Sequence, residues 1–224
     1  MFKFPLAMLL AAAALGASAS ASASARQPQR LDRDPATREE VRIFARFSRC
    51  VAGHWADRER SRALLALDYR TEHYRHELLR LAGDNSRCVP PGSRLAFGGV
   101  LFAGGLAENL LRQRGAVADL AGWVALDPAR PAIASRDETE LMALCVVRAA
   151  PAKVSALLRT APASDEEGAA LHALLPEFAS CLRAGSGVTL NRLSGRAILA
   201  LAAYRLADHN GWSRPRAAAA ASGG

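Results

Sequence analysis

The sequence predicts an all-α protein built from two tandem copies of a roughly four-helix unit, each with one internal disulfide, behind a cleaved signal peptide. Three observations lead to this prediction. Apolar residues recur every three or four positions and not every two, four cysteines fall into two similarly spaced pairs, and the chain opens with an export leader. Half of the 224 residues are hydrophobic, which is enough for a sizeable core.

The first segment sets the expected compartment. A positively charged start (residues 1–3) precedes an uncharged apolar run (6–15) and the sequence ASASASASA (17–25), which together are typical of a secretory signal peptide. Cleavage is expected after Ala21, Ala23 or Ala25, with Ala25 preferred. A membrane anchor is the alternative, but it needs about 20 apolar residues. We therefore expect residues 1–25 to be removed and the mature chain to be periplasmic or secreted and not membrane-spanning, with disordered ends at 26–36 and 210–224.

Four cysteines remain after cleavage: Cys50, Cys88, Cys145 and Cys181. In an oxidising compartment an even count favours two disulfides, and four cysteines allow three pairings. Zinc binding is the competing interpretation, but these cysteines lack the close spacing of structural zinc sites.

An internal repeat narrows the pairing. Sliding the chain by 93 to 98 residues aligns Cys50-Val51 with Cys145-Val146, Cys88 with Cys181, and Arg94-Leu95 with Arg192-Leu193, in order. Chance in an Ala- and Leu-rich chain is the alternative. A unit that duplicated with both cysteines would already have closed its own loop, so the repeat predicts Cys50–Cys88 and Cys145–Cys181.

The copies also help to place the helices. The break at Pro162 and the Ser164-Asp-Glu-Glu167 sequence predict a helix start with a capping box near 165, and Thr71 is the equivalent cap in copy one. Repeat 1 (37–114) is expected to hold helices at 37–53, 57–68, 72–83 and 94–113. Repeat 2 (136–209) is expected to hold helices at 137–149, 151–160, 165–183 and 190–208. Between them lies a linker, 115–135, packed down by Trp123. Whether the copies share one core stays open.

The apolar faces follow the helical period. Val41, Phe44, Phe47 and Val51 share one face of the first helix. A second set of residues with this spacing predicts one core-facing side along the next two helices. It comprises Leu64, Leu67, Thr71, Tyr74, Leu78 and Leu81.

The net charge of +8 hints at an acidic partner. Of the 29 basic residues 27 are arginine, a bias that a GC-rich genome produces without selection for binding. No nucleic-acid-binding motif occurs, and an exported protein seldom meets nucleic acid. Repeat 1 holds most of the excess, so Arg58 and Arg62, which share a helix face, are candidate anion-binding residues. Arg94 and Arg192, at matching positions, either bind an anion or form a buried salt bridge.

Other motifs have simple structural readings. His73 and His76, with His54 upstream, have the spacing of a helical metal site, but two solvent-facing histidines are the preferred explanation. The GGVLFAGGLAENLL stretch (98–111) lacks a nucleotide-binding pattern, and its glycines predict close helix packing. No nucleophile or metalloprotease motif occurs, and disulfide-bonded cysteines cannot attack a substrate. We expect no catalytic residue, no metal and no cofactor.

Four features occur together in this chain: the leader, the Cys-Val helix, a second cysteine about 37 residues later, and a following helix with an Arg-Leu start. In these features the chain resembles uncharacterised exported, cysteine-containing helical repeat proteins of GC-rich Gram-negative bacteria. The resemblance covers most of residues 38–208 and implies a fold but no activity. The sequence predicts an exported, non-enzymatic interaction module of unknown partner, either another envelope protein or anionic envelope material. The alternatives are a carrier of an apolar or anionic small molecule between helix layers, in a pocket lined by Trp55, Phe97 and Phe102, and an enzyme.

Overall fold

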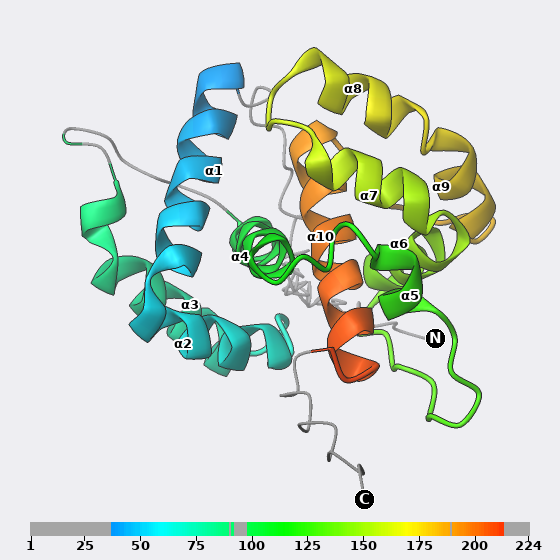
Figure 1. Ribbon diagram of the computed structural model, residues 1–224, viewed down its shortest axis with the longest axis horizontal. Coiled ribbons are helices and arrows are strands. Elements are labelled where there is room, and N and C mark those ends of the chain that lie inside the picture. The colour runs from blue at the N-terminus through cyan, green and yellow to red at the C-terminus, as the bar shows by residue number, and fades with distance from the viewer. Residues whose placement is uncertain (1–36, 90, 92–97, 189, 213–224) are drawn as a thin grey trace, which may run out of the picture. The chain divides into compact units, whose positions relative to one another are not determined.

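The computed structural model of the chain describes residues 37–89, 91, 98–188 and 190–212, and in these ranges every regular element is a helix (Figure 1). The earlier helices are α1 (Arg38–Gly53), α2 (Trp55–Ala66), α3 (Glu72–Asp84), the short 3-10 helix η1 (Ser86–Cys88) and α4 (Gly99–Gln113). The later helices are α5 (Leu120–Val124), α6 (Glu138–Ala149), α7 (Pro151–Arg159), α8 (Asp165–His172), α9 (Leu175–Cys181) and α10 (Arg192–His209). The all-α prediction is confirmed. The predicted signal peptide and the segment 26–36 lie outside the described residues.

Both predicted helix caps are present. The Thr71 hydroxyl accepts a hydrogen bond from the Tyr74 backbone N–H at 3.2 Å, and the Ser164 hydroxyl accepts one from the Glu167 N–H at 3.1 Å. Each cap satisfies a backbone donor that has no partner within the first turn of its helix. The Ser164 cap is not a full capping box, because the Glu167 carboxylate instead accepts from the Ala163 N–H at 3.0 Å.

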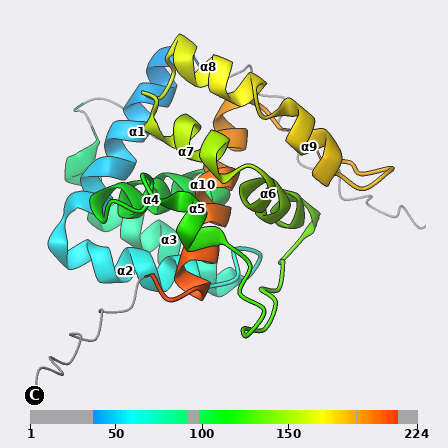
Figure 2. The same cartoon turned by 45° about the vertical axis from the view of Figure 1, so that its right-hand side comes forward.

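The core is organised around α4 and α10, which pack against each other at the centre (Figures 1 and 2). Helix α1 packs on α4, and α6 packs on α10. This matched arrangement is what a duplicated unit would produce, and the duplication itself stays a prediction. One continuous cluster of buried side chains includes residues from both predicted repeats, from Phe47 and Phe102 to Leu157 and Leu199. The two halves therefore share one core.

The predicted apolar faces are buried, except that Leu67 is half-buried and Thr71 is exposed. Phe44, Phe47 and Val51 of α1 are in the core, with Val41 half-buried beside them. Along α2 and α3, Leu64, Tyr74, Leu78 and Leu81 are at most 4% exposed, so they form the inner face of both helices.

Close contact between α4 and α10 depends on small side chains. A Cβ atom added to Gly104 would lie 2.4 Å from the Ala197 carbonyl oxygen and 2.6 Å from the Ala197 Cα. A Cβ atom on Gly105 would lie 2.4 Å from the Ser48 Oγ of α1. The glycines of the 98–111 stretch thus let three helices meet, as the sequence predicted.

Two disulfides join Cys50 to Cys88 and Cys145 to Cys181, with Cα–Cα distances of 5.8 and 5.7 Å. No cysteine is free. The first bond links α1 to η1, and the second links α6 to α9. Because the bonds span 38 and 36 residues, the chain-entropy estimate gives each a stabilisation of about 4 kcal/mol.

Helix boundaries differ from the predictions by more than two residues in two places. The helix expected at 165–183 is broken into α8 and α9, because Pro176 in the first turn of α9 has no N–H to donate and its ring clashes with the carbonyl four residues earlier. Helix α4 begins at Gly99, with Gly98 extended before it. Residues 94–97, where its start was expected, lie outside the described residues.

Two segments expected to lie outside the helical units contribute to the core. The predicted linker 115–135 contains α5, whose Leu120 and Val124 are each 1% exposed. The predicted disordered tail begins with an ordered part, because Trp212 is 7% exposed and its ring meets the Tyr204 ring edge-on at 5.8 Å. Large apolar side chains near the core account for both corrections. Residues 213–224 lie outside the described residues.

Of the described helices, none alone has the length and hydrophobicity of a membrane span. Helices α6 and α7 reach that length and composition only when taken together across a bend of 100°.

Candidate functional site

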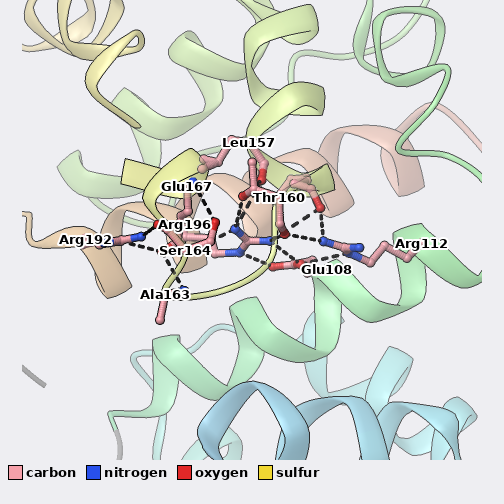
Figure 3. A network of polar contacts seen from close by, with 10 residues as sticks. Glu108, Arg112, Leu157, Thr160, Ala163, Ser164, Glu167, Arg192 and Arg196 are labelled. Atoms are coloured by element: carbon pink, nitrogen blue, oxygen red, sulfur yellow. Dashed lines mark hydrogen bonds and ion pairs between the residues drawn. The ribbon is translucent and has the colours of Figure 1, made fainter. Parts of the chain in front are cut away.

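A buried ion-pair network crosses the interface between the two halves (Figure 3). Arg196 of α10 is 4% exposed and donates from Nε to Glu108 Oε2 at 2.8 Å and from Nη2 to Glu108 Oε1 at 2.7 Å. Its Nη1 donates to Glu167 Oε1 at 3.0 Å. The guanidinium also donates to the backbone carbonyls of Leu157, Leu158 and Thr160. One side chain of α10 therefore ties α4, the end of α7 and α8 together.

Two further arginines complete the network. Arg112 donates from Nε to Glu108 Oε1 at 3.0 Å, and Arg192 donates from Nε to Glu167 Oε2 at 2.6 Å. Burial alone lowers the pKa of Arg196, but the hydrogen bonds and charges of Glu108 and Glu167 outweigh it and leave that pKa above its ordinary value. The arginine therefore stays charged in the interior.

The network decides between the two predictions made for Arg192. Arg192 forms a salt bridge with Glu167, which is 1% exposed, and it also donates to the Ser164 carbonyl. Arg192 is thus a structural residue here and not a free cation awaiting an anion. Arg94, its predicted counterpart, lies outside the described residues.

Glu140, another buried carboxylate, is the centre of a second ion-pair network. It is fully buried and pairs with Arg205 of α10 and with Arg136, whose Nη1 lies 3.6 Å from Glu140 Oε1. The Arg136 guanidinium also lies over the Tyr69 ring, 5.2 Å from its centre. The Tyr69 hydroxyl donates to Asp137 Oδ2 at 2.5 Å. Glu108, Glu140 and Glu167 are each paired with arginine, whereas Asp137 accepts from the Tyr69 hydroxyl.

Sequence reasoning missed Glu108 and Arg196 as network members. A signal was present, because each is a charged residue within an otherwise apolar helical stretch. Such a residue must find a partner once its helix is buried, and the two stretches are the ones that pack together.

The arginines of α2 provide little free positive charge. Arg62 pairs with Glu59 at 2.7 Å, and Arg60 pairs with Asp57 at 3.2 Å and with Asp84 at 2.8 Å. Within the part of the chain that the structure describes, Arg58 has no ion pair, and its Nε is buried without a hydrogen-bond partner. Of the two predicted anion-binding residues on this helix, Arg58 keeps an uncompensated charge and Arg62 does not.

A groove of about 310 Å³ lies between α2 and α3. Its apolar lining comes from Leu64, Leu67 and Leu81, together with the exposed Ala63. Charged or polar side chains also line it, namely Arg60, His73 and Glu77. We call this feature the α2–α3 groove.

The residues expected to line a carrier pocket are not brought together. Phe102 is fully buried against Phe47, with ring centres 5.2 Å apart, whereas Trp55 is 79% exposed. Phe97 lies outside the described residues. His73 and His76 are both exposed, and the described residues contain no group of three His, Cys, Asp or Glu side chains placed to hold a metal ion.

Comparison with known protein families, with curated proteins and with solved structures found no match for this chain. The site therefore has to be interpreted from its own geometry.

Proposed function

We propose that the mature chain is an exported, non-enzymatic interaction module that binds another envelope protein through the α2–α3 groove. The observation that carries the proposal is the groove itself, an apolar depression with both charge signs at its edge on an otherwise well-packed helix pair. Protein interfaces commonly rely on a few apolar anchors that enter such depressions, surrounded by polar contacts. A groove of about 310 Å³ has room for one or two apolar side chains of a partner.

The disulfides support an exported location. Two bonds without a free cysteine are compatible with an oxidising extracellular or periplasmic environment. They also hold the groove in place, because Cys50–Cys88 fixes the end of the α3–η1 segment to α1. A groove on a rigid support loses less entropy on binding than one that must first become ordered.

The charge pairing favours a protein partner over anionic envelope material. An anionic polymer would bind a set of free arginines, but Arg60 and Arg62 are already compensated by acidic neighbours on the same surface. Mixed charge at the groove edge, with Arg60 and Glu77 both present, instead suits a partner that carries both signs.

The test blocks the groove without touching the core. Ala63→Trp places a large side chain in the groove from an exposed position of α2. The control, Ala156→Trp, places the same side chain at an exposed position of α7, outside the groove. Tagged mature wild type and both variants are used to capture proteins from the solubilised envelope of the producing cell. Circular dichroism confirms that each variant keeps its helices.

We expect wild type and Ala156→Trp to retain the same envelope protein, and Ala63→Trp to lose it by at least about tenfold. Equal capture by all three proteins would refute the groove as the binding site. The carrier is the second candidate, since about 300 Å³ is the lower limit of small-molecule pockets. It would be supported if native mass spectrometry found a small molecule bound to wild type and missing from Ala63→Trp.

A further inference from the structure

A small cavity of about 40 Å³ lies where α1, α4 and α10 meet, away from the α2–α3 groove. One water molecule needs about 10 to 15 Å³ of such space, so the cavity admits a ligand of only a few non-hydrogen atoms. Gly105 lets Ser48 approach α4 closely at this cavity, because a Cβ atom there would collide with the Ser48 hydroxyl at 2.4 Å.

Ser48 provides an unused polar group in this cavity. The residue is fully buried and lines the cavity, and its Oγ has no hydrogen-bond partner. Buried hydroxyls are nearly always hydrogen-bonded, since an unpaired one loses its contact with water and gains nothing in return. The Ser48 hydroxyl is therefore available to donate to a ligand atom in the cavity.

The charges around the cavity favour an anion. Arg49 also lines it, is exposed, and has no ion-pair or hydrogen-bond partner among the described residues. On the other side lies the network of Figure 3, where three arginines face two glutamates, for a formal charge of 3 − 2 = +1. Glu108, the acidic residue of the lining, is held by Arg112 and Arg196, so it leaves the Arg49 charge without compensation.

Apart from Asn109 and the network residue Arg196, the remaining lining is apolar and includes Phe44, Leu101 and Leu193. A ligand here needs a charged end for Arg49 and Ser48 and a short hydrocarbon part for these side chains. We propose that the cavity binds a free short-chain carboxylate of about propionate size, with the Arg49 guanidinium and the Ser48 hydroxyl donating to its carboxylate. This site does not depend on the proposed groove, and either proposal can fail without the other.

The probe is propionate, with binding to the mature protein measured by NMR titration. Propionamide has the same shape without the charge, and formate has the charge without the hydrocarbon part. We expect saturable propionate binding, and weaker binding of both other probes. Arg49→Gln should weaken propionate binding by at least about tenfold, and Ser48→Ala by several-fold, as hydrogen bonds to a charged and to a neutral donor imply.

Arg159→Gln is the matched control, because Arg159 is also exposed and makes no ion pair. It should bind propionate as wild type does. Ala45→Leu, which fills the cavity from α1, should abolish binding while circular dichroism shows an intact fold. Three results would each overturn the proposal. They are equal binding of propionate and propionamide, an equal loss of propionate affinity in Arg49→Gln and Arg159→Gln, and the lack of saturable propionate binding.

Discussion

Arg196→Met tests how much the two halves of the core depend on the buried network. The variant keeps an apolar stem of similar length and removes the charge that faces Glu108 and Glu167. Breaking a buried ion pair by removing one partner costs about 3 to 5 kcal/mol, because the remaining charge stays buried. Each glutamate keeps one other arginine, Arg112 or Arg192, so we expect the lower end, about 3 kcal/mol.

Urea unfolding followed by helical circular dichroism measures this loss. The control is Arg75→Met, which breaks an ion pair with Glu72 whose side chains are 65% and 82% exposed. Solvent screens such a pair, so no measurable change is expected. Arg196→Lys should fall between wild type and Arg196→Met, because lysine keeps the charge but not the two-pronged contact with Glu108. A loss in Arg196→Met no larger than in the control would refute the reasoning.

Three further predictions concern the packing. Gly104→Ala should destabilise the protein by about 1 to 3 kcal/mol, because its Cβ would collide with the Ala197 backbone. Gly83→Ala, with open space around it, should stabilise the protein by about 0.5 kcal/mol in the same urea assay. Equal effects of the two substitutions would contradict the close α4–α10 contact. Residues 136–209 alone should be less helical than within the whole chain and should regain helix when residues 37–114 are added, and full helicity without them would contradict the shared core. Burial raises the pKa of every tyrosine above the ordinary value of about 10. The contribution of each neutral tyrosine to the free energy of unfolding is therefore complete below about pH 10, and it is lost as pH rises through the pKa of that tyrosine in the folded protein. Phenolate absorbance should therefore appear together with unfolding, and phenolate formation in the folded protein would contradict this for Tyr69, Tyr74 and Tyr204.

Local sequence patterns predicted the helices well because the signals act locally. Thr71 and Ser164 cap their helices through their own side chains, and the apolar period identifies which face is inward whatever lies opposite it. The disulfide pairing was also accessible, because the cysteine spacing is repeated within the chain. Even the break between α8 and α9 had a local signal in Pro176, which was overlooked.

Contacts between distant elements could not be predicted in the same way. Glu108 and Arg196 are 88 residues apart, and only the packing of α4 on α10 brings them together. The α2–α3 groove likewise depends on how far two neighbouring helices separate, which the period of apolar residues does not encode. The neutralisation of Arg60 by Asp84 follows from that same helix pairing, so the charge count of repeat 1 overstated its free positive charge.

Disulfides stabilise each half of this molecule, whereas noncovalent contacts hold the two halves together. Both disulfides connect residues of the same half, whereas α4, α10 and the Arg196 network join the halves without any covalent link except the chain itself. A single nick in the exposed stretch around Leu126, which is 69% exposed, would turn the protein into a two-chain heterodimer that denaturant separates. The same nick inside either disulfide loop would leave one covalent molecule, so the position of a cut decides whether the protein can come apart.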